Sequence, residues 1–65
     1  MISNHKDLIE IPGKVLSESD KAIRFDAGID QPVWLPKSQL EDWPDVGEYG
    51  DVLMHEWLAE EKGLI

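Results

Sequence analysis

The sequence of 65 residues contains no cysteine. This absence excludes a disulfide scaffold, a thiolate metal site and a nucleophilic thiol. Because small secreted domains usually depend on disulfides, we expect this chain to act in the reducing cytoplasm. It also lacks an apolar run near the roughly 18 residues of a membrane span, and residues 1–7 are too polar for a signal peptide. We therefore expect a soluble, unprocessed protein without membrane contacts.

Positive charge is scarce as well, with six Lys and Arg residues against 14 Asp and Glu residues and a formal net charge of −8. No Lys or Arg lies between Lys37 and Lys62. That span instead carries eight carboxylates, namely Glu41, Asp42, Asp45, Glu48, Asp51, Glu56, Glu60 and Glu61. Many small domains are acidic for solubility alone, but charge gathered into one block often marks an interaction surface. A field of this sign repels nucleic acid and attracts basic surfaces, so we expect a protein partner with a basic surface and no direct nucleic-acid binding.

Length and composition predict a single small domain over residues 1–65, with residues 1–7 frayed. A chain of this size buries about 60% of its unfolded surface, so its core is small. The content of 42% hydrophobic and 31% charged residues is typical of a folded protein rather than of an acidic disordered chain.

Alternating and apolar patterns predict a series of short strands. They cover residues 8–11, 14–16, 21–26, 32–36 and 51–54. The Pro12-Gly13 step is predicted to interrupt the run as an edge, a bulge or a bend between the first two strands, because proline lacks the N–H that a central strand donates. Ile23 and Phe25 share the predicted inward face of one strand. Val52 and Met54 share that of the last strand.

Two helical segments are predicted in the second half of the chain. Ser38 and Glu41 have the S-x-x-E spacing of a capping box, which favours a short helical turn. Residues 56–62 are good helix formers, and Gly63 stands where a C-cap glycine belongs. Residues 64–65 are expected to fold back onto the core.

Together these elements predict an α+β, mostly β fold. It is a small antiparallel meander or SH3-like open barrel of four to five short strands, with a short C-terminal helix. Small barrels of this kind often bind nucleic acid through exposed aromatic residues on a basic face. The distribution of charge along the sequence indicates that such a basic face is missing here.

No residue pattern indicates catalysis, a cofactor or a metal site. His5 and His55 are the only imidazoles, and a zinc site needs three or four ligands at suitable spacing. Glu56 and Glu60 are spaced to share a solvated helix face. Without a nucleophile or an electrophile, the sequence predicts a protein that is not an enzyme and uses no cofactor.

Three tryptophans supply much of the apolar surface. Trp57, on the terminal helix, is predicted to pack in the core. For Trp34 the sequence leaves core packing and exposure equally open, because its neighbours already define the opposite face of their strand. Trp43 lies in a loop between an acid and a proline, and is the best candidate for an exposed interface anchor.

Two stretches resemble known sequences. They read VWLPKSQL at residues 33–40, within the wider segment 21–41, and EWLAEEKGLI at residues 56–65. This pattern resembles that of short uncharacterised proteins and C-terminal modules encoded in bacteriophages and prophages. The resemblance implies a phage or mobile-element origin but no biochemical activity. The chain departs from that group at Met54-His55 and in an acidic insertion over residues 43–50, where a specialised function is expected.

The first interpretation of these features is an acidic inhibitor or nucleic-acid mimic. It would occupy a Lys- and Arg-lined groove of a host enzyme, such as a CRISPR effector, a nuclease or a transcription component. Carboxylates would replace phosphates, and an aromatic side chain would fill an apolar notch. The predicted partner-binding residues are Glu41, Asp42, Trp43, Asp45, Glu48, Tyr49, Asp51 and Trp34.

The alternative interpretation is an accessory small-barrel module of phage recombination or replication. In that case the sheet is a scaffold and the face of Trp34 docks a protein partner. A third interpretation is single-stranded nucleic-acid binding through Trp34, Arg24 and Lys37, which the net charge makes the weakest of the three.

Overall fold

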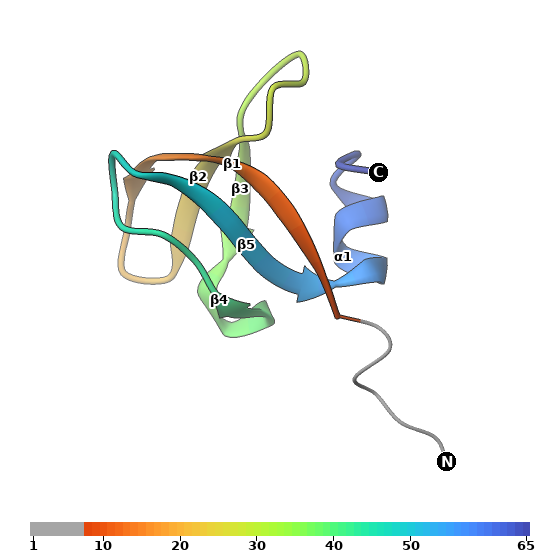
Figure 1. Cartoon of the computed structure of the whole chain (residues 1–65). Helices are drawn as coiled ribbons and strands as arrows, with labels where there is room; N and C mark the ends of the chain where they lie inside the picture. Colours follow the sequence, from red (N-terminus) through yellow and green to blue (C-terminus); the bar gives the residue numbers. More distant parts are fainter. Residues whose placement is uncertain (1–7) are drawn as a thin grey trace.

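Residues 8–65 are described by the computed structural model, which consists of one five-stranded antiparallel sheet and a short C-terminal helix (Figure 1). The strands are β1 (Leu8–Glu18), β2 (Ala22–Asp26), β3 (Val33–Pro36), β4 (Leu40–Asp42) and β5 (Tyr49–His55). A 3-10 turn, η2 (Lys37–Gln39), joins β3 to β4, and α1 (Glu56–Glu61) follows β5 directly. The predicted mostly β fold with a C-terminal helix is confirmed. The frayed end predicted for residues 1–7 lies outside the described residues.

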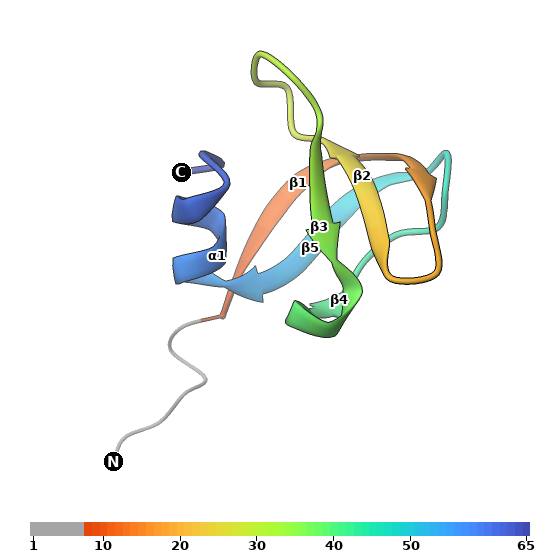
Figure 2. The ribbon, with the colours of Figure 1, turned by 180° about the vertical axis from the view of Figure 1, so that it is seen from behind.

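The strand order across the sheet is β3-β2-β1-β5-β4. The long strand β1 is central, because residues 8–14 pair with β5 and residues 14–18 pair with β2. β3 and β4 form the two edges of the sheet, yet only the three residues of η2 connect them. The sheet therefore curls until its edges approach each other, as in an open barrel (Figure 2).

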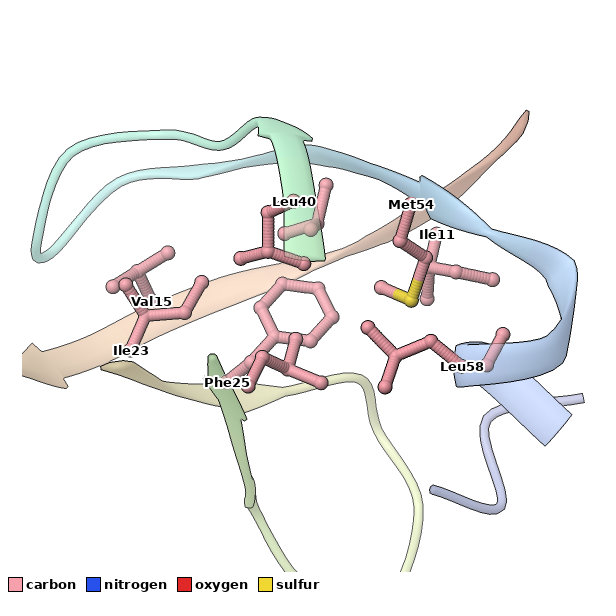
Figure 3. Close-up of a cluster of buried hydrophobic side chains, with 10 residues drawn as sticks. Ile11, Val15, Ile23, Phe25, Leu40, Met54 and Leu58 are labelled. Atoms are coloured by element: carbon pink, nitrogen blue, oxygen red, sulfur yellow. The ribbon is translucent and has the colours of Figure 1, made fainter. Parts of the chain in front are cut away.

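Alternate side chains of each strand point into the curled sheet and form the core (Figure 3). The buried residues are Ile11, Val15, Ile23, Phe25, Leu35, Leu40, Val52, Met54, Leu58 and Ala59. The inward faces predicted for β2 and β5 are thus confirmed. α1 contributes Leu58 and Ala59, so the helix packs on the same core as the sheet.

Pro12 and Gly13 do not interrupt β1, contrary to the prediction from the sequence. The N–H of Val15 points toward the chain entering β5 and donates to the carbonyl oxygen of Glu48 (3.3 Å). Because backbone N–H groups alternate between the two sides of a strand, the nitrogen of Pro12 faces away from β5. On that side, β2 pairs with β1 only from Lys14 onward. Pro12 therefore leaves no ladder hydrogen bond unmade, and the strand continues.

The short helical turn predicted from Ser38 and Glu41 is present only as a single 3-10 turn, and the predicted capping box is wrong. A 3-10 turn covers Lys37–Gln39 without a side-chain cap hydrogen bond, and β4 begins directly after it. Leu40, the first residue of β4, is buried and pairs with Met54 of β5. Burial of this leucine in the curled sheet outweighs the modest helix preference of the local sequence.

The predicted C-terminal helix is confirmed, and Gly63 ends it with a positive φ of 75°. The N–H of Gly63 donates to the carbonyl of Glu60 (3.1 Å). The N–H of Leu64 donates to the carbonyl of Ala59 (2.8 Å), which completes a Schellman motif. Leu64 packs against the core while Ile65 stays exposed, so the predicted return of the C-terminus is confirmed for Leu64 only.

Candidate functional site

Five of the eight carboxylates of the acidic block lie on one β-hairpin, which we call the acidic hairpin (residues 41–51). Its exposed carboxylates are Glu41, Asp42, Asp45, Glu48 and Asp51. The remaining three belong to α1 and are Glu56, Glu60 and Glu61. The turn of the hairpin and α1 lie at opposite ends of the molecule (Figure 1 and Figure 2). The carboxylates of the turn are thus far from those of α1, whereas Glu41 and Asp42 lie on the strand that pairs with the last residues of β5 before the helix.

The turn of the acidic hairpin is tied to the rest of the sheet by backbone hydrogen bonds. The N–H of Glu48 donates to the carbonyl of Asp45 (2.9 Å), and Gly47, at the third position of this turn, has a φ of 88°. A positive φ at that position is the geometry of a type II turn, which favours glycine. The N–H of Gly47 also donates to the carbonyl of Val15 in β1 (2.7 Å). The turn is therefore held against the central strand, and its carboxylates have a defined place.

The carboxylates of the acidic hairpin are not neutralised by neighbouring side chains. Within residues 8–65 the one ion pair joins Lys37 Nζ to Glu18 Oε1 (3.3 Å) and involves no carboxylate of the hairpin. Asp42 accepts a hydrogen bond from the backbone N–H of Trp43 (2.9 Å), which fixes its side chain locally. The hairpin consequently presents five exposed negative charges that a basic partner can pair with.

Apolar surface lies between these carboxylates. Tyr49 is 75% exposed and stands at the start of β5, opposite Lys14 of β1. Val46, in the turn, is also exposed. The sequence did not single out Val46, because a lone valine in a polar loop carries no pattern of its own. Charged groups around an exposed aromatic side chain are a suitable composition for an interface.

Trp43 is not the exposed anchor that the sequence predicts. Its side chain is half-buried and packs against the hydrophobic core. An indole buries a large apolar area, and in a core as small as this one that area is used for folding. The acid and the proline beside Trp43 predict a loop correctly, but they do not determine which side of the loop the ring faces.

Replacing Trp43 and Tyr49 separately by alanine distinguishes a core residue from a surface residue. We expect Trp43→Ala to lower the free energy of unfolding by about 2 kcal/mol, because partly buried aromatic contacts are lost. We expect Tyr49→Ala to change it by less than about 0.5 kcal/mol, since its ring is mostly in water. Urea denaturation followed by circular dichroism measures both values. Equal effects of the two substitutions would contradict this assignment.

The other two tryptophans are each 49% exposed. The prediction of a core role for Trp57 is wrong, because α1 buries its neighbours Leu58 and Ala59 instead. The indole of Trp57 stacks on His55, with ring centroids 6.4 Å apart and an interplanar angle of 16°. Trp34 projects from the outer face of β3, at the other edge of the sheet from β4. Seven of the eight predicted partner-binding residues therefore lie on the acidic hairpin, and Trp34 belongs to a different surface.

Within residues 8–65, no group of three or more His, Cys, Asp or Glu side chains is arranged to hold a metal ion. His5 lies outside that range. Among the same residues, no helix has the length and the apolar character needed to cross a membrane. Comparisons with models of protein families, with curated proteins and with solved structures found no match.

Proposed function

We propose that this is a non-enzymatic acidic interaction protein whose acidic hairpin binds a Lys- and Arg-lined surface of another protein. The observation that carries this proposal is the set of five exposed carboxylates on one hairpin, none of them in an ion pair within residues 8–65. The exposed ring of Tyr49, which lies between Glu48 and Asp51 in the sequence, supplies apolar contact. Complementary charge directs the encounter and fixes the orientation of such a complex.

The partner best suited to this hairpin is a basic groove that otherwise holds nucleic acid. Carboxylates accept the same charge-assisted hydrogen bonds from Arg and Lys as phosphates do. The resemblance of the chain to phage and prophage proteins supports a host nucleic-acid enzyme as the target. In this role the protein is an inhibitor, because it occupies the groove in place of the substrate.

A second candidate function is an accessory module of phage recombination or replication that docks a protein through Trp34. The exposure of Trp34 on an edge strand favours it. The two functions respond differently to salt. Binding through the acidic hairpin weakens steeply as ionic strength rises, whereas binding through an apolar ring does not.

The test of the proposed function compares two triple substitutions that change the net charge equally. Asp45→Asn/Glu48→Gln/Asp51→Asn neutralises the hairpin, and Glu56→Gln/Glu60→Gln/Glu61→Gln neutralises α1 at the opposite end. The tagged variants and the parent are used to capture partners from a host lysate, with elution by a salt gradient and mass spectrometry. The affinity for the purified partner is then measured by calorimetry.

We expect the hairpin variant to lose affinity and the α1 variant to bind like the parent. Three exposed charge pairs contribute about 0.6–3 kcal/mol in total, which corresponds to a roughly 3- to 150-fold loss. Asp42 is left unchanged, because its carboxylate also accepts the N–H of Trp43. Equal losses in both variants would show an unspecific effect of net charge, and no loss in either would refute the proposal.

A further inference from the structure

The outer face of β2 and β3 forms a second surface, which we call the Trp34 face. Ile23, Phe25 and Leu35 of these strands point into the core. The residues that alternate with them along each strand, Arg24 and Trp34, therefore point outward. β2 and β3 lie side by side (Figure 2), and in their register Arg24 lies directly opposite Trp34. Side chains of directly opposite residues start about 4.5–5.5 Å apart. An exposed indole and an exposed guanidinium group are therefore neighbours.

A hollow of about 550 Å³ lies next to this pair. It is lined by Asp20, Lys21, Pro36, Lys37 and Ser38. The hollow forms where the N–H of Lys37 in η2 donates to the carbonyl of Lys21 (2.8 Å), which holds η2 against the start of β2. Pro36 is two residues from Trp34 on the same side of β3, a separation of about 7 Å along the strand. Trp34 does not line the hollow itself but lies on the same side of β3 as Pro36, which does.

Basic side chains concentrate around the Trp34 face. Of the five Lys and Arg residues in the described part of the chain, only Lys62 lies at the end of α1. The other four are Lys14 on β1, Lys21 just before β2, Arg24 on β2 and Lys37 on η2. The curled sheet brings three of these four to the outer face of β2 and to the hollow. Two carboxylates lie among them, because Asp20 also lines the hollow and Glu18 pairs with Lys37. Trp57 is equally exposed, but it stands on a helix that carries three glutamates.

We propose that the Trp34 face binds a nucleotide unit, either as part of a single-stranded nucleic acid or as a free nucleotide. The base stacks on Trp34 beside the guanidinium plane of Arg24. The phosphate enters the hollow, where Lys21 and Lys37 supply positive charge and the hydroxyl of Ser38 donates a hydrogen bond. This inference goes beyond the proposed function and uses none of the residues of the acidic hairpin.

The net charge of −8 opposes this binding only at long range. At 0.1 M salt the Debye length is about 10 Å, so exposed charges farther away than this contribute little. Whether a phosphate binds is decided by the charges nearest the hollow. There, Lys21 and Lys37 attract a phosphate and Asp20 repels it, while Glu18 pairs with Lys37 at 3.3 Å and competes for its ammonium group.

The three indole N–H groups allow a direct test by nuclear magnetic resonance. The ¹⁵N-labelled full chain is titrated at 0.1 M salt with an eight-nucleotide oligothymidylate and, separately, with thymidine monophosphate. We expect the indole signal of Trp34 and backbone signals of residues 20–24 and 33–38 to shift, while the indole signal of Trp57 stays in place. Shifts with both ligands identify a nucleotide site, and shifts with the oligonucleotide alone identify a single-strand site.

Substitutions then separate stacking from charge. Trp34→Ala is expected to weaken binding at least about fivefold, whereas Trp57→Ala, which removes an equally exposed indole, leaves it unchanged. Glu18→Gln is expected to strengthen binding roughly two- to fivefold, because it releases the ammonium group of Lys37. Lys37→Gln is expected to weaken binding roughly two- to fivefold. Lys62→Gln, at the end of α1, is its matched control.

Three outcomes would overturn the proposal. The first is the absence of shifts with either ligand, and the second is an equal loss in the two tryptophan variants. The third is a weaker affinity for Glu18→Gln, which would show that the hollow does not receive an anion. If nucleotides do not bind but Trp34→Ala abolishes association with a purified protein partner, the Trp34 face is a protein-docking surface instead. None of these results depends on the acidic hairpin.

Discussion

Replacing Phe25 by alanine is expected to unfold a large part of the protein at 25 °C. Phe25 is fully buried, and its ring lies near the centre of the cluster of core side chains (Figure 3). Truncating a buried phenylalanine to alanine costs about 3–5 kcal/mol, through lost transfer energy and the cavity left behind. A domain of this length has a total stability of roughly 3–10 kcal/mol. The substitution therefore removes much or all of that stability.

Phe25→Leu is the matched control, because it keeps most of the volume and the apolar character. We expect it to cost less than about 1.5 kcal/mol. Urea denaturation followed by circular dichroism at 25 °C gives both values. If the midpoints of the two variants coincided, Phe25 would not be the centre of the core.

Replacing Gly13 by alanine is the second substitution with a large expected effect. A Cβ atom at this position would overlap the backbone carbonyl oxygen of Asp26 and lie 2.5 Å from Cζ of Phe25. The carbonyl belongs to a paired strand and cannot rotate away, so β1 and β2 must separate. We expect a loss of about 3 kcal/mol, at the upper end of the usual cost of overpacking a core.

Gly50, which pairs with Gly13 across β1 and β5, provides the control. A Cβ atom there would meet the Cγ of Pro44 at 3.1 Å, a contact that a small shift of the loop relieves. We expect Gly50→Ala to cost less than about 1 kcal/mol. The double variant Gly13→Ala/Phe25→Leu should recover part of the loss of Gly13→Ala, because one of the two overlaps disappears. Equal denaturation midpoints for Gly13→Ala and Gly50→Ala would contradict the close approach at Gly13.

Phe25→Ala and Gly13→Ala also bear on the function, because the acidic hairpin and the Trp34 face belong to the same sheet. β2 presents Arg24 outward and Phe25 inward, and β1 supports the turn of the acidic hairpin through Val15. A variant that separates β1 from β2 is therefore expected to impair both surfaces together. The substitutions at the hairpin and at Trp34, in contrast, change one surface and leave the other intact. This difference allows a loss of binding to be assigned to folding or to a site.

Local sequence patterns predicted those parts of the fold whose structure depends on residues close together in the sequence. The alternation of Ile23 and Phe25 is enough to define an inward face, because side chains of a strand alternate strictly. The terminal helix and its end at Gly63 follow from helix propensity and from the need for a positive φ. The S-x-x-E pattern at Ser38 did not predict the structure, because a contact with a strand distant in the sequence decides the conformation there. A capping box requires a helix to follow it, and pairing of Leu40 with β5 prevents that helix.

The candidate site was predicted less completely than the fold. The exposure of the hairpin carboxylates was predicted, because it follows from their charge. The roles of the tryptophans were not, because an indole is suited both to a core and to an interface. Trp43 and Trp57 consequently exchanged the environments predicted for them, with Trp43 against the core and Trp57 half exposed.

By itself, the sequence determined the class of fold, the inward faces of the strands and the acidic character of the second half of the chain. These properties depend on composition and on spacings of a few residues. Only the tertiary structure decided that the acidic block divides between the hairpin and α1, and that Lys21 and Lys37 meet beside Trp34. Both arrangements depend on which strands pair and on how the sheet curls. Those contacts join residues far apart in the chain, so no local pattern encodes them.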